Sequence, residues 1–453
     1  MSTAETKRGL NCGLKLSIIT QFYPPDYAAT GQLIAELAGQ LGKLDLFVNV
    51  FTGQPGYAFQ TKKAPAVEHL EQLTIKRCTL PGSTALAHAS KIWSRRIRGK
   101  TLNGLLFFLF SVLHLLKASN RGDVLLVTTA PPFLPLLGYL ANKIFGLPYV
   151  CLLYDLYPDI AVKLNVVPDS NGLVRLWKGM NRRVWQRAQQ VVVLSPSMKK
   201  RVVAHCPGIA DKVTVVHSWA DPNWIVPIAK KDNWFAQELN LVNTFTVLYS
   251  GNMGRCHDME TILEAVKLLR NEPIRFIFIG NGAKREALRS QVNQLGLGNC
   301  QFLPYQDKKD LPYSLTACDL SLVSISPGME GLVAPSKFYG ALASGRPVAV
   351  ICEQHSYLRG MITEAGCGQA FDNGDGASLA AFIHSLARDA QLVEQMGQAG
   401  RYYIKCNFTP ELIAKQYWKL LLCQPLFKSP QNQQSLHSRG LNYGKLPTLT
   451  NKT

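Results

Sequence analysis

The residues most suited to chemistry lie in one stretch, residues 327 to 347. Turn-forming residues open it, and Pro335 and Ser336 then lead into a short helical pattern. The start of a helix leaves unpaired N–H groups and a partial positive charge, which suit a phosphate or diphosphate. Lys337 adds a cation to the first turn, a position that favours a bound anion over helix stability. Glu330 is a candidate partner for a sugar hydroxyl.

A plain connection between a loop and a helix, with a solvated lysine, explains the same stretch. Gly345 and Pro347 end the predicted helix, and residues 348 to 351 follow as a short buried strand. The local pattern leaves both interpretations open.

The first half of the chain predicts a doubly wound α/β domain. Residues 14 to 20 form a predicted buried strand, residues 21 to 31 a loop, and residues 32 to 44 an amphipathic helix. This strand–loop–helix order is the opening unit of such a domain. The loop is not GxGxxG, because Gly31 is its only glycine near the helix start, so a dinucleotide fingerprint is absent. Further strands are predicted within residues 46–52, 73–80, 123–132, 147–159, 191–202 and 213–223.

Four polar side chains follow the strands of this half: Asp155, Asp159, Ser195 and His217. Open parallel sheets bind their ligands at the carboxyl ends of the strands, so these residues are candidates for chemistry. An Asp or Ser in such a place is also a common helix N-cap. That alternative stays open for Asp155 and Ser195.

The alternation of strands and helices pauses at residues 221 to 243, which have the Pro, Lys and Asn content of a linker, and then restarts. Residues 244–255 and 274–292 both predict a strand followed by a glycine-bearing loop. A polar C-terminal tail is expected to be disordered. We therefore expect a flexible N-terminus (1–13), a first domain (14–220), a linker (221–243), a second domain (244–408), a terminal helix (409–425) and a disordered tail (426–453).

The composition indicates a globular protein with an anionic partner. The 453 residues are 47% hydrophobic and carry a net charge of +19. Such an excess suits nucleic acid, an anionic membrane surface or a phosphorylated substrate. The eleven cysteines are scattered, with no CxxC pair, which is typical of reduced thiols in a cytosolic protein. The N-terminus has no signal-peptide pattern.

Two windows without Asp or Glu concentrate the positive charge. An apolar run at residues 102 to 116 lies in the first window, and it is short for a membrane span, which needs about 20 residues. It predicts either a helix buried against the sheet or a helix dipping into one leaflet, with Trp93 at the headgroups. The second window either extends that surface or is a solvated helix face. The basic residues are Lys76, Arg77, Lys91, Arg95, Arg96, Arg98, Lys100, Lys117 and Arg121 in residues 72–122, and Arg175, Lys178, Arg182, Arg183, Arg187, Lys199, Lys200 and Arg201 in residues 170–210.

Several segments resemble the retaining group 1 (family 4) glycosyltransferases of GT-B fold. The donor-binding half of that family is similar to YSGNMGRCHDMETILEA, FIFIGNGAKRE, LPYQDKKDLPYSLTACDLSLV and VAPSKFYGALASGRPV. The opening of its acceptor half resembles FYPPDYAATGQLIAELAGQL, and a DLWPD-type segment resembles YDLYPD. The resemblance is strongest to bacterial transferases for capsule, exopolysaccharide (colanic-acid type) and O-antigen assembly.

This resemblance implies an α/β protein of GT-B architecture, with two Rossmann-like doubly wound domains facing across a cleft. It implies a nucleotide-diphosphate sugar donor in the C-terminal half and an acceptor, often lipid-linked, in the N-terminal half. No metal or other cofactor is expected, because a fixed positive cradle can stabilise the charge on the leaving diphosphate. The leaving diphosphate can itself deprotonate the acceptor hydroxyl on the same face of the sugar.

The resemblance also implies roles for individual residues. The diphosphate would be held by Arg255, Lys337 and the N–H groups around Ser336, with Gly251 admitting the backbone. The base would lie near Gly280, Gly282 and the backbone from Leu303 to Tyr305, and the remaining donor-side candidates are Asn252 and Gly331. Asp155 is the expected contact for the acceptor hydroxyl, and the other acceptor-side candidates are Gly31, Tyr157 and Asp159.

This sequence departs from the family pattern in two places. The family's pair of glutamates, eight positions apart, would fall here near Leu332 and on Gly340. Glu330 is the acidic residue present, and we expect it to serve in their place. The Arg and Lys that follow the family's first donor loop do not align either, and Arg255 and His257 fall nearby.

Three classes of function stay open. The first is a retaining glycosyltransferase at the cytoplasmic face of the plasma membrane, acting in exopolysaccharide or lipopolysaccharide biosynthesis. The second is a nucleotide-sugar 2-epimerase of the same architecture, which needs no membrane surface. The third is a non-enzymatic basic protein that binds nucleic acid or a membrane. The chain lacks basic strands interleaved with aromatic residues, so we expect no nucleic-acid partner.

Overall fold

The computed structural model describes residues 13–26, 28–55, 64–78 and 96–422. The predicted N-terminal segment up to residue 12 and the predicted tail, residues 426–453, lie outside these ranges. The same holds for three residues of the first basic window, Lys91, Trp93 and Arg95. For Arg96, Arg98 and Lys100 the structure describes the backbone and not the side chains.

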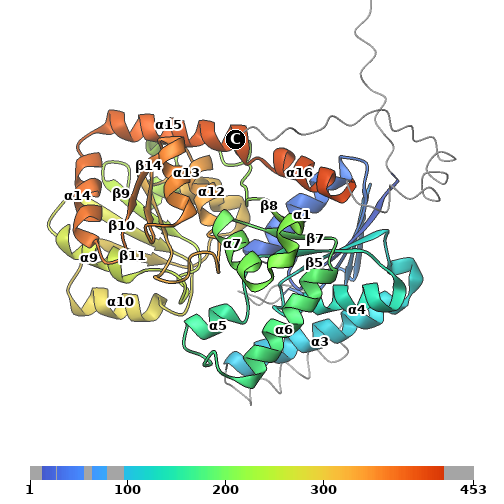
Figure 1. The fold of residues 1–453 in the computed structure, drawn as a ribbon. Coiled ribbons are helices and arrows are strands. Elements are labelled where there is room, and N and C mark those ends of the chain that lie inside the picture. The colour runs from blue at the N-terminus through green and yellow to red at the C-terminus, as the bar shows by residue number, and fades with distance from the viewer. Residues whose placement is uncertain (1–12, 27, 56–63, 79–95, 423–453) are drawn as a thin grey trace, which may run out of the picture.

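Two sheets form the framework, which confirms the predicted α/β class with two doubly wound halves (Figure 1). The first sheet has the order β3-β4-β2-β1-β5-β6-β7-β8, and all of its neighbours are parallel except β3 with β4. Its strands are β1 (Lys15–Ile19), β2 (Phe47–Thr52), β3 (Val67–Leu70), β4 (Leu73–Arg77), β5 (Val124–Thr128), β6 (Tyr149–Leu153), β7 (Gln190–Val193) and β8 (Val213–Val215).

The second sheet is parallel throughout and has the order β11-β10-β9-β12-β13-β14. Its strands are β9 (Phe245–Ser250), β10 (Ile274–Ile279), β11 (Cys300–Leu303), β12 (Leu320–Ser324), β13 (Val348–Ile351) and β14 (Gly368–Phe371). Because helices cover both faces of a parallel sheet, its central strands are continuous apolar runs. Strands β5, β6, β12 and β13 are accordingly buried along their whole length.

Helices connect these strands. Those of the first half are α1 (Ala29–Gly42), α3 (Arg96–Leu116), α4 (Pro135–Phe145), α5 (Asp159–Lys163), α6 (Gly172–Arg187) and α7 (Pro196–His205). Those that follow are α8 (Trp234–Glu238), α9 (Glu260–Leu268), α10 (Arg285–Gln294), α11 (Leu311–Thr316), α12 (Lys337–Ala343), α13 (Tyr357–Ala365), α14 (Gly376–Leu386), α15 (Ala390–Asn407) and α16 (Pro410–Leu422). Helix α1 begins three residues before the predicted start at residue 32.

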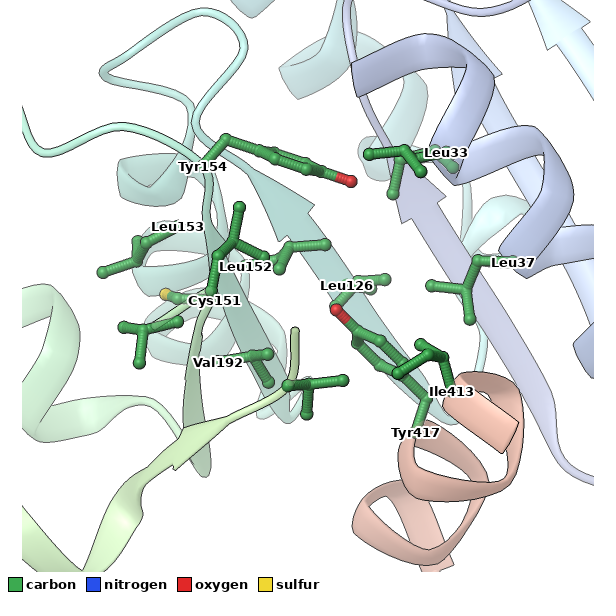
Figure 2. Close-up of a cluster of buried hydrophobic side chains, with 14 of the residues drawn as sticks. Leu33, Leu37, Leu126, Cys151, Leu152, Leu153, Tyr154, Val192, Ile413 and Tyr417 are labelled. Carbon is green, nitrogen blue, oxygen red and sulfur yellow. The ribbon is translucent and has the colours of Figure 1, made fainter. Parts of the chain in front are cut away.

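The last helix returns to the first half of the molecule. Helix α16 packs against α1, and Figure 2 shows Ile413 and Tyr417 among Leu33, Leu37 and Leu126. Ile413 and Tyr417 are fully buried. The apolar periodicity predicted the helix, but no local pattern specifies which distant surface it covers. The chain thus crosses between the halves twice.

Helix α3 packs on the first sheet with one face only. Phe107 and Leu115 are buried, and the Phe107 ring stacks on Phe51 with 5.9 Å between centroids. The prediction of a helix buried against the sheet is therefore confirmed for one face of α3, and the opposite face is exposed. None of the helices in the described part of the chain is long and apolar enough to cross a membrane.

Helices α12 and α15 approach each other closely behind the stretch that carries Lys337. A Cβ added at Gly397 of α15 would stand 2.2 Å from the Gly345 carbonyl oxygen, just beyond α12. A backbone atom cannot move aside as the end of a long side chain can, so only glycine fits at Gly397.

We expect Gly397→Ala to lower the free energy of unfolding by about 1–3 kcal/mol, the usual effect of overpacking. Gly360→Ala in α13 is the matched control, because no atom lies within 4 Å of its added Cβ and alanine favours a helix by about 1 kcal/mol. Calorimetry should therefore show opposite shifts in melting temperature. Equal shifts would mean that α12 and α15 are not in tight contact.

Candidate active site

Two glycine loops lie side by side at the carboxyl edge of the second sheet. Strands β9 and β10 are parallel neighbours, and the Gly251 N–H donates to the Ile279 carbonyl at 2.8 Å. Gly251 and Gly280 have φ of 129° and 127°, in the region that favours glycine. A Cβ on Gly280 would lie 2.2 Å from the Gly251 oxygen. The two loops therefore expose backbone rather than side chains at this edge.

Lys337 reaches these loops from the first turn of α12. Its Nζ donates to the Tyr249 hydroxyl and, at 3.2 Å, to the Asn252 carbonyl. The same atom lies 3.9 Å from the centroid of the Tyr249 ring. Burial lowers the pKa of Lys337 to about 7. The ammonium has no carboxylate partner among the ion pairs of the described residues. A bound anion could therefore pair with it.

A second lysine follows the β10 loop. Lys284 Nζ donates to the His257 carbonyl and pairs with Glu260, both at 2.8 Å. His257 Nδ1 lies 2.8 Å from the Ser324 carbonyl. Burial lowers the pKa of His257 to about 3, and the charge on Lys337 adds to this effect. His257 is therefore neutral near pH 7, and the positive charge beside the glycine loops comes from lysines.

The first half meets the second at the end of β6. Asp155 forms a β-bridge with Val333, and the Leu156 N–H donates to the Leu332 carbonyl at 3.1 Å. Burial raises the pKa of Asp155 to about 6. Burial raises the pKa of the Cys256 thiol, which lies between β9 and α9, and the Asp155 charge adds to this rise. Asp155 therefore lies at the junction of the halves, and it is not an N-cap, because Pro158 precedes α5.

Arg201 of α7 spans the same junction. Its Nε donates to the Glu330 carbonyl at 2.6 Å and its Nη2 to the Gly328 carbonyl at 3.4 Å. The Glu330 side chain is only 2% exposed, and neither of its carboxylate oxygens has a hydrogen-bond partner in the described residues. Burial raises the pKa of the Tyr357 hydroxyl, and the nearby Glu330 carboxylate adds to this rise. Glu330 is thus a buried acceptor with unused capacity.

Three of the remaining donor-side candidates border the glycine loops. Gly282 has a φ of 150° and packs on Met253, and the Leu303 carbonyl already accepts from the Gly280 N–H at 3.0 Å. The Tyr305 ring lies 3.3 Å from an added Cβ on Gly280, so it borders the second loop.

Three further donor-side predictions have different surroundings from those expected. The Arg255 side chain is exposed, and its carbonyl accepts from the Ser326 hydroxyl at 3.4 Å. Ser336 caps α12 without a side-chain hydrogen bond. An added Cβ on Gly331 would stand 2.7 Å from the Ser197 oxygen of α7. Gly331 therefore allows the close contact between the two halves, and it is not part of the two glycine loops.

Of the other acceptor-side candidates, two pack against neighbouring segments and one forms an ion pair. Gly31 allows α1 to approach the preceding loop, since an added Cβ would lie 2.9 Å from the Phe22 backbone. The Tyr157 ring stacks on Trp177 at 6.3 Å. Asp159 pairs with His205 at 3.0 Å, and despite its burial this bond and Lys178 lower its pKa. Asp159 ties α5 to α6 and α7, which differs from the predicted acceptor contact.

Two other candidates are structural. Ser195 caps α7 by accepting from the Met198 N–H at 3.1 Å, so its N-cap interpretation is correct. His217 Nδ1 lies 3.1 Å from the Tyr339 hydroxyl, and its ring packs edge-on to Phe408. Both side chains are therefore engaged by neighbouring parts of the protein.

Lys284 is absent from the residues predicted from sequence, and Arg201 is among them only as part of a basic window. Lys284 follows the GNG loop by two residues, a position that could have identified it. Nothing local distinguishes Arg201 from neighbouring cations, because its role comes from a contact 129 residues away. Among the described residues no group of three His, Cys, Asp or Glu side chains could hold a metal ion, and the cysteines are free thiols.

The arrangement suits an anion held against backbone and lysines, with a carboxyl group approaching from the other half. Comparison with known proteins identifies the family of both halves. The family model for group 1 glycosyl transferases matches residues 230–403, and the model for glycosyltransferase family 4 matches residues 30–224. The two matched regions correspond to the two halves of the structure.

Curated relatives match much of the chain. WbjE of Pseudomonas aeruginosa, named as a probable glycosyltransferase, is 29% identical over 284 residues, 62% of this chain and 69% of the relative. WcaI of Escherichia coli K12, assigned by name to colanic acid biosynthesis as a glycosyl transferase, is 27% identical over 61% of this chain and 68% of the relative.

Solved structures share the fold over nearly the whole chain. Sucrose-phosphate synthase from Thermosynechococcus elongatus has a TM-score of 0.68 at 17% identity, covering 94% of this chain and 100% of that one. HepE from Anabaena, in complex with UDP-glucose, has a TM-score of 0.64 at 16% identity, covering 90% and 99%. WaaG, a glycosyltransferase involved in lipopolysaccharide biosynthesis, has a TM-score of 0.65 at 13% identity, covering 89% and 99%. The two family models together cover more than half of the chain, which therefore belongs to the group 1 and family 4 glycosyltransferases, and the solved structures show that it has the GT-B architecture.

Proposed function

We propose that the protein transfers a sugar from a nucleotide-diphosphate donor to a lipid-linked saccharide acceptor, with retention of the anomeric configuration. The product would enter cell-surface polysaccharide biosynthesis, which the name of WcaI and the description of WaaG support. The observation that carries this proposal is the placement of the Lys337 ammonium against the Gly251 and Gly280 loops. The complex of HepE with UDP-glucose supports the choice of donor class.

In this proposal the diphosphate lies between Lys337, Lys284 and the backbone of the glycine loops. Breaking the anomeric bond makes a sugar cation and a diphosphate whose negative charge grows. Fixed cations and N–H groups that face the growing charge lower the barrier, so no metal is required for this step. The nucleotide base lies beside Gly282 and Tyr305.

The acceptor hydroxyl would approach from the first half, beside Asp155. Its proton passes to the leaving diphosphate oxygen on the same face of the sugar, which gives retention without a separate base. Asp155 orients the hydroxyl by accepting or sharing its hydrogen bond. Glu330 has unused acceptor capacity for a donor-sugar hydroxyl, at a point where the family's first glutamate is displaced by two positions. The enzyme would work at the inner face of the plasma membrane, where an anionic lipid-diphosphate acceptor complements its charge of +19.

The direct test supplies purified protein with UDP-, GDP- and ADP-sugars, with and without a lipid-diphosphate saccharide from a polysaccharide-producing bacterium. We expect one donor to be consumed only when the acceptor is present, and NMR of the new linkage to show the donor's anomeric configuration. Conversion of the donor sugar without acceptor would instead identify an epimerase. An inverted linkage would refute the same-face mechanism.

The perturbed Lys337 predicts a pH-dependent affinity for the donor. The empty site holds its pKa near 7, while a bound diphosphate favours the charged ammonium and raises that pKa. Binding then takes up a proton, so affinity should be greatest below pH 7 and fall as the pH rises from 7 to 9. A nucleotide sugar is the appropriate probe, because the charge on its diphosphate diester is constant over this range.

Calorimetric titration of the accepted nucleotide sugar measures this profile. Lys337→Ala should bind about tenfold more weakly at pH 7, the effect of about 1.4 kcal/mol, with a flat profile up to pH 9. The His257 imidazole stays neutral throughout this range and should not contribute. If the wild type and the variant show the same slope, the ammonium does not face the diphosphate.

A further inference from the structure

Helix α3 carries a continuous stripe of exposed leucines. Leu102, Leu105, Leu109, Leu113 and Leu116 are spaced three or four residues apart, so they share one face of the helix. Each of them is between 48% and 56% exposed. The opposite face holds the buried Phe107 and Leu115. A soluble surface rarely keeps so many large apolar side chains in one line without a partner.

Neighbouring helices extend the surface. Helix α4 packs against both α3 and α6, and Figure 1 shows these three helices together on one side of the first sheet, with α1 and α16 on the other. Leu173 and Leu176 of α6 are 74% and 65% exposed, and Ile144 of α4 is 66% exposed. The three helices therefore form a layer with exposed apolar residues on each member.

The same layer is strongly basic. Helix α6 has no acidic residue, and its exposed Arg183 and Arg187 lie on the same side as Leu176, seven and eleven residues further along. Lys117 after α3 and Lys143 beside Ile144 are also exposed. Arg175, Arg182 and Arg183 take part in none of the ion pairs found in the described residues. Their charges are available to an external anion.

We propose that the α3 leucine stripe, with α6 beside it, docks the protein on the surface of an anionic lipid bilayer. Helix α3 has 21 residues and would lie in the plane of the interface with its leucines among the acyl chains. The arginines of α6 would meet the lipid phosphates. This deepens the proposed function, because it states how the enzyme would reach a lipid-linked acceptor.

The positive charge of this layer favours an anionic lipid surface over a second copy of the protein as the partner. A second copy would bring the same basic residues to the interface, and like charges would repel, whereas anionic headgroups complement both the leucines and the cations. Helix α6 also supports the acceptor loop, since Asn181 donates to the Tyr157 carbonyl at 2.7 Å and Trp177 stacks on the Tyr157 ring. The docking layer is thus continuous with the acceptor side of the site.

The test measures flotation of the full-length protein with vesicles of phosphatidylglycerol and phosphatidylcholine, compared with vesicles of phosphatidylcholine alone. We expect the protein to float with the anionic vesicles, and less so at high salt. The triple variant Leu105→Ser, Leu109→Ser, Leu113→Ser should lose at least tenfold of this binding and keep its melting temperature, because these side chains are exposed. Leu109→Glu should act in the same direction with the helix intact.

The matched control replaces three other exposed leucines, Leu70, Leu268 and Leu295, by serine, and it should float as the wild type does. Three results would overturn the proposal. The stripe variants could float as well as the wild type. The wild type could form a dimer that the stripe variants break, with no vesicle binding, which would assign the stripe to a second copy. The wild type could neither float nor dimerise, which would show that the stripe binds neither a bilayer nor a second copy. The flotation assay contains no sugar donor or acceptor. A negative flotation result therefore does not contradict sugar transfer, and a negative transfer assay does not contradict docking on the bilayer.

Discussion

The backbone pairing of Asp155 and Leu156 with Leu332 and Val333 holds the two halves together where the site forms. Arg201 reinforces it by donating to the Glu330 carbonyl at 2.6 Å. These contacts join main-chain atoms, so they fix the backbone at Asp155 against the segment that carries Glu330 and Val333. The packing of α16 on α1 adds a second crossing far from the site. Together they limit how the two halves can lie relative to each other.

Electrostatics at this junction follows from burial. Burial removes water from the Lys337 ammonium, whose partners among the described residues are the neutral Tyr249 hydroxyl and Asn252 carbonyl, so its pKa falls to about 7. The Asp155 carboxyl loses water as well, and its pKa rises to about 6. Both groups therefore titrate close to neutral pH. A bound diphosphate would favour the charged form of the lysine. Such perturbed groups are typical of functional sites, although structural pairs produce them too.

The sequence predicted the fold well because strands and helices leave local periodicities. The buried strands at β1, β5 and β13, the helix at α12 and the cap at Ser195 all follow from patterns within ten residues. Long-range contacts leave no such pattern. The position of α16 on α1, the contact of Arg201 with Glu330 and the ion pair that engages Asp159 depend on residues far apart in the chain. Helix α3 lies between these cases: its apolar run was evident, but only the structure separates the buried Phe107 face from the exposed leucines.

Ligand-induced stabilisation tests most directly whether Lys337, Lys284 and the glycine loops bind a nucleotide diphosphate, as we propose. Melting temperatures would be measured with UDP, GDP, ADP and their sugars, with and without EDTA. A ligand at a hundred times its dissociation constant adds about 2.7 kcal/mol to the free energy of unfolding, which is readily observed. The account predicts stabilisation by one nucleotide and its sugar, unchanged by EDTA. Absence of stabilisation by every nucleotide, or stabilisation that EDTA abolishes, would contradict it.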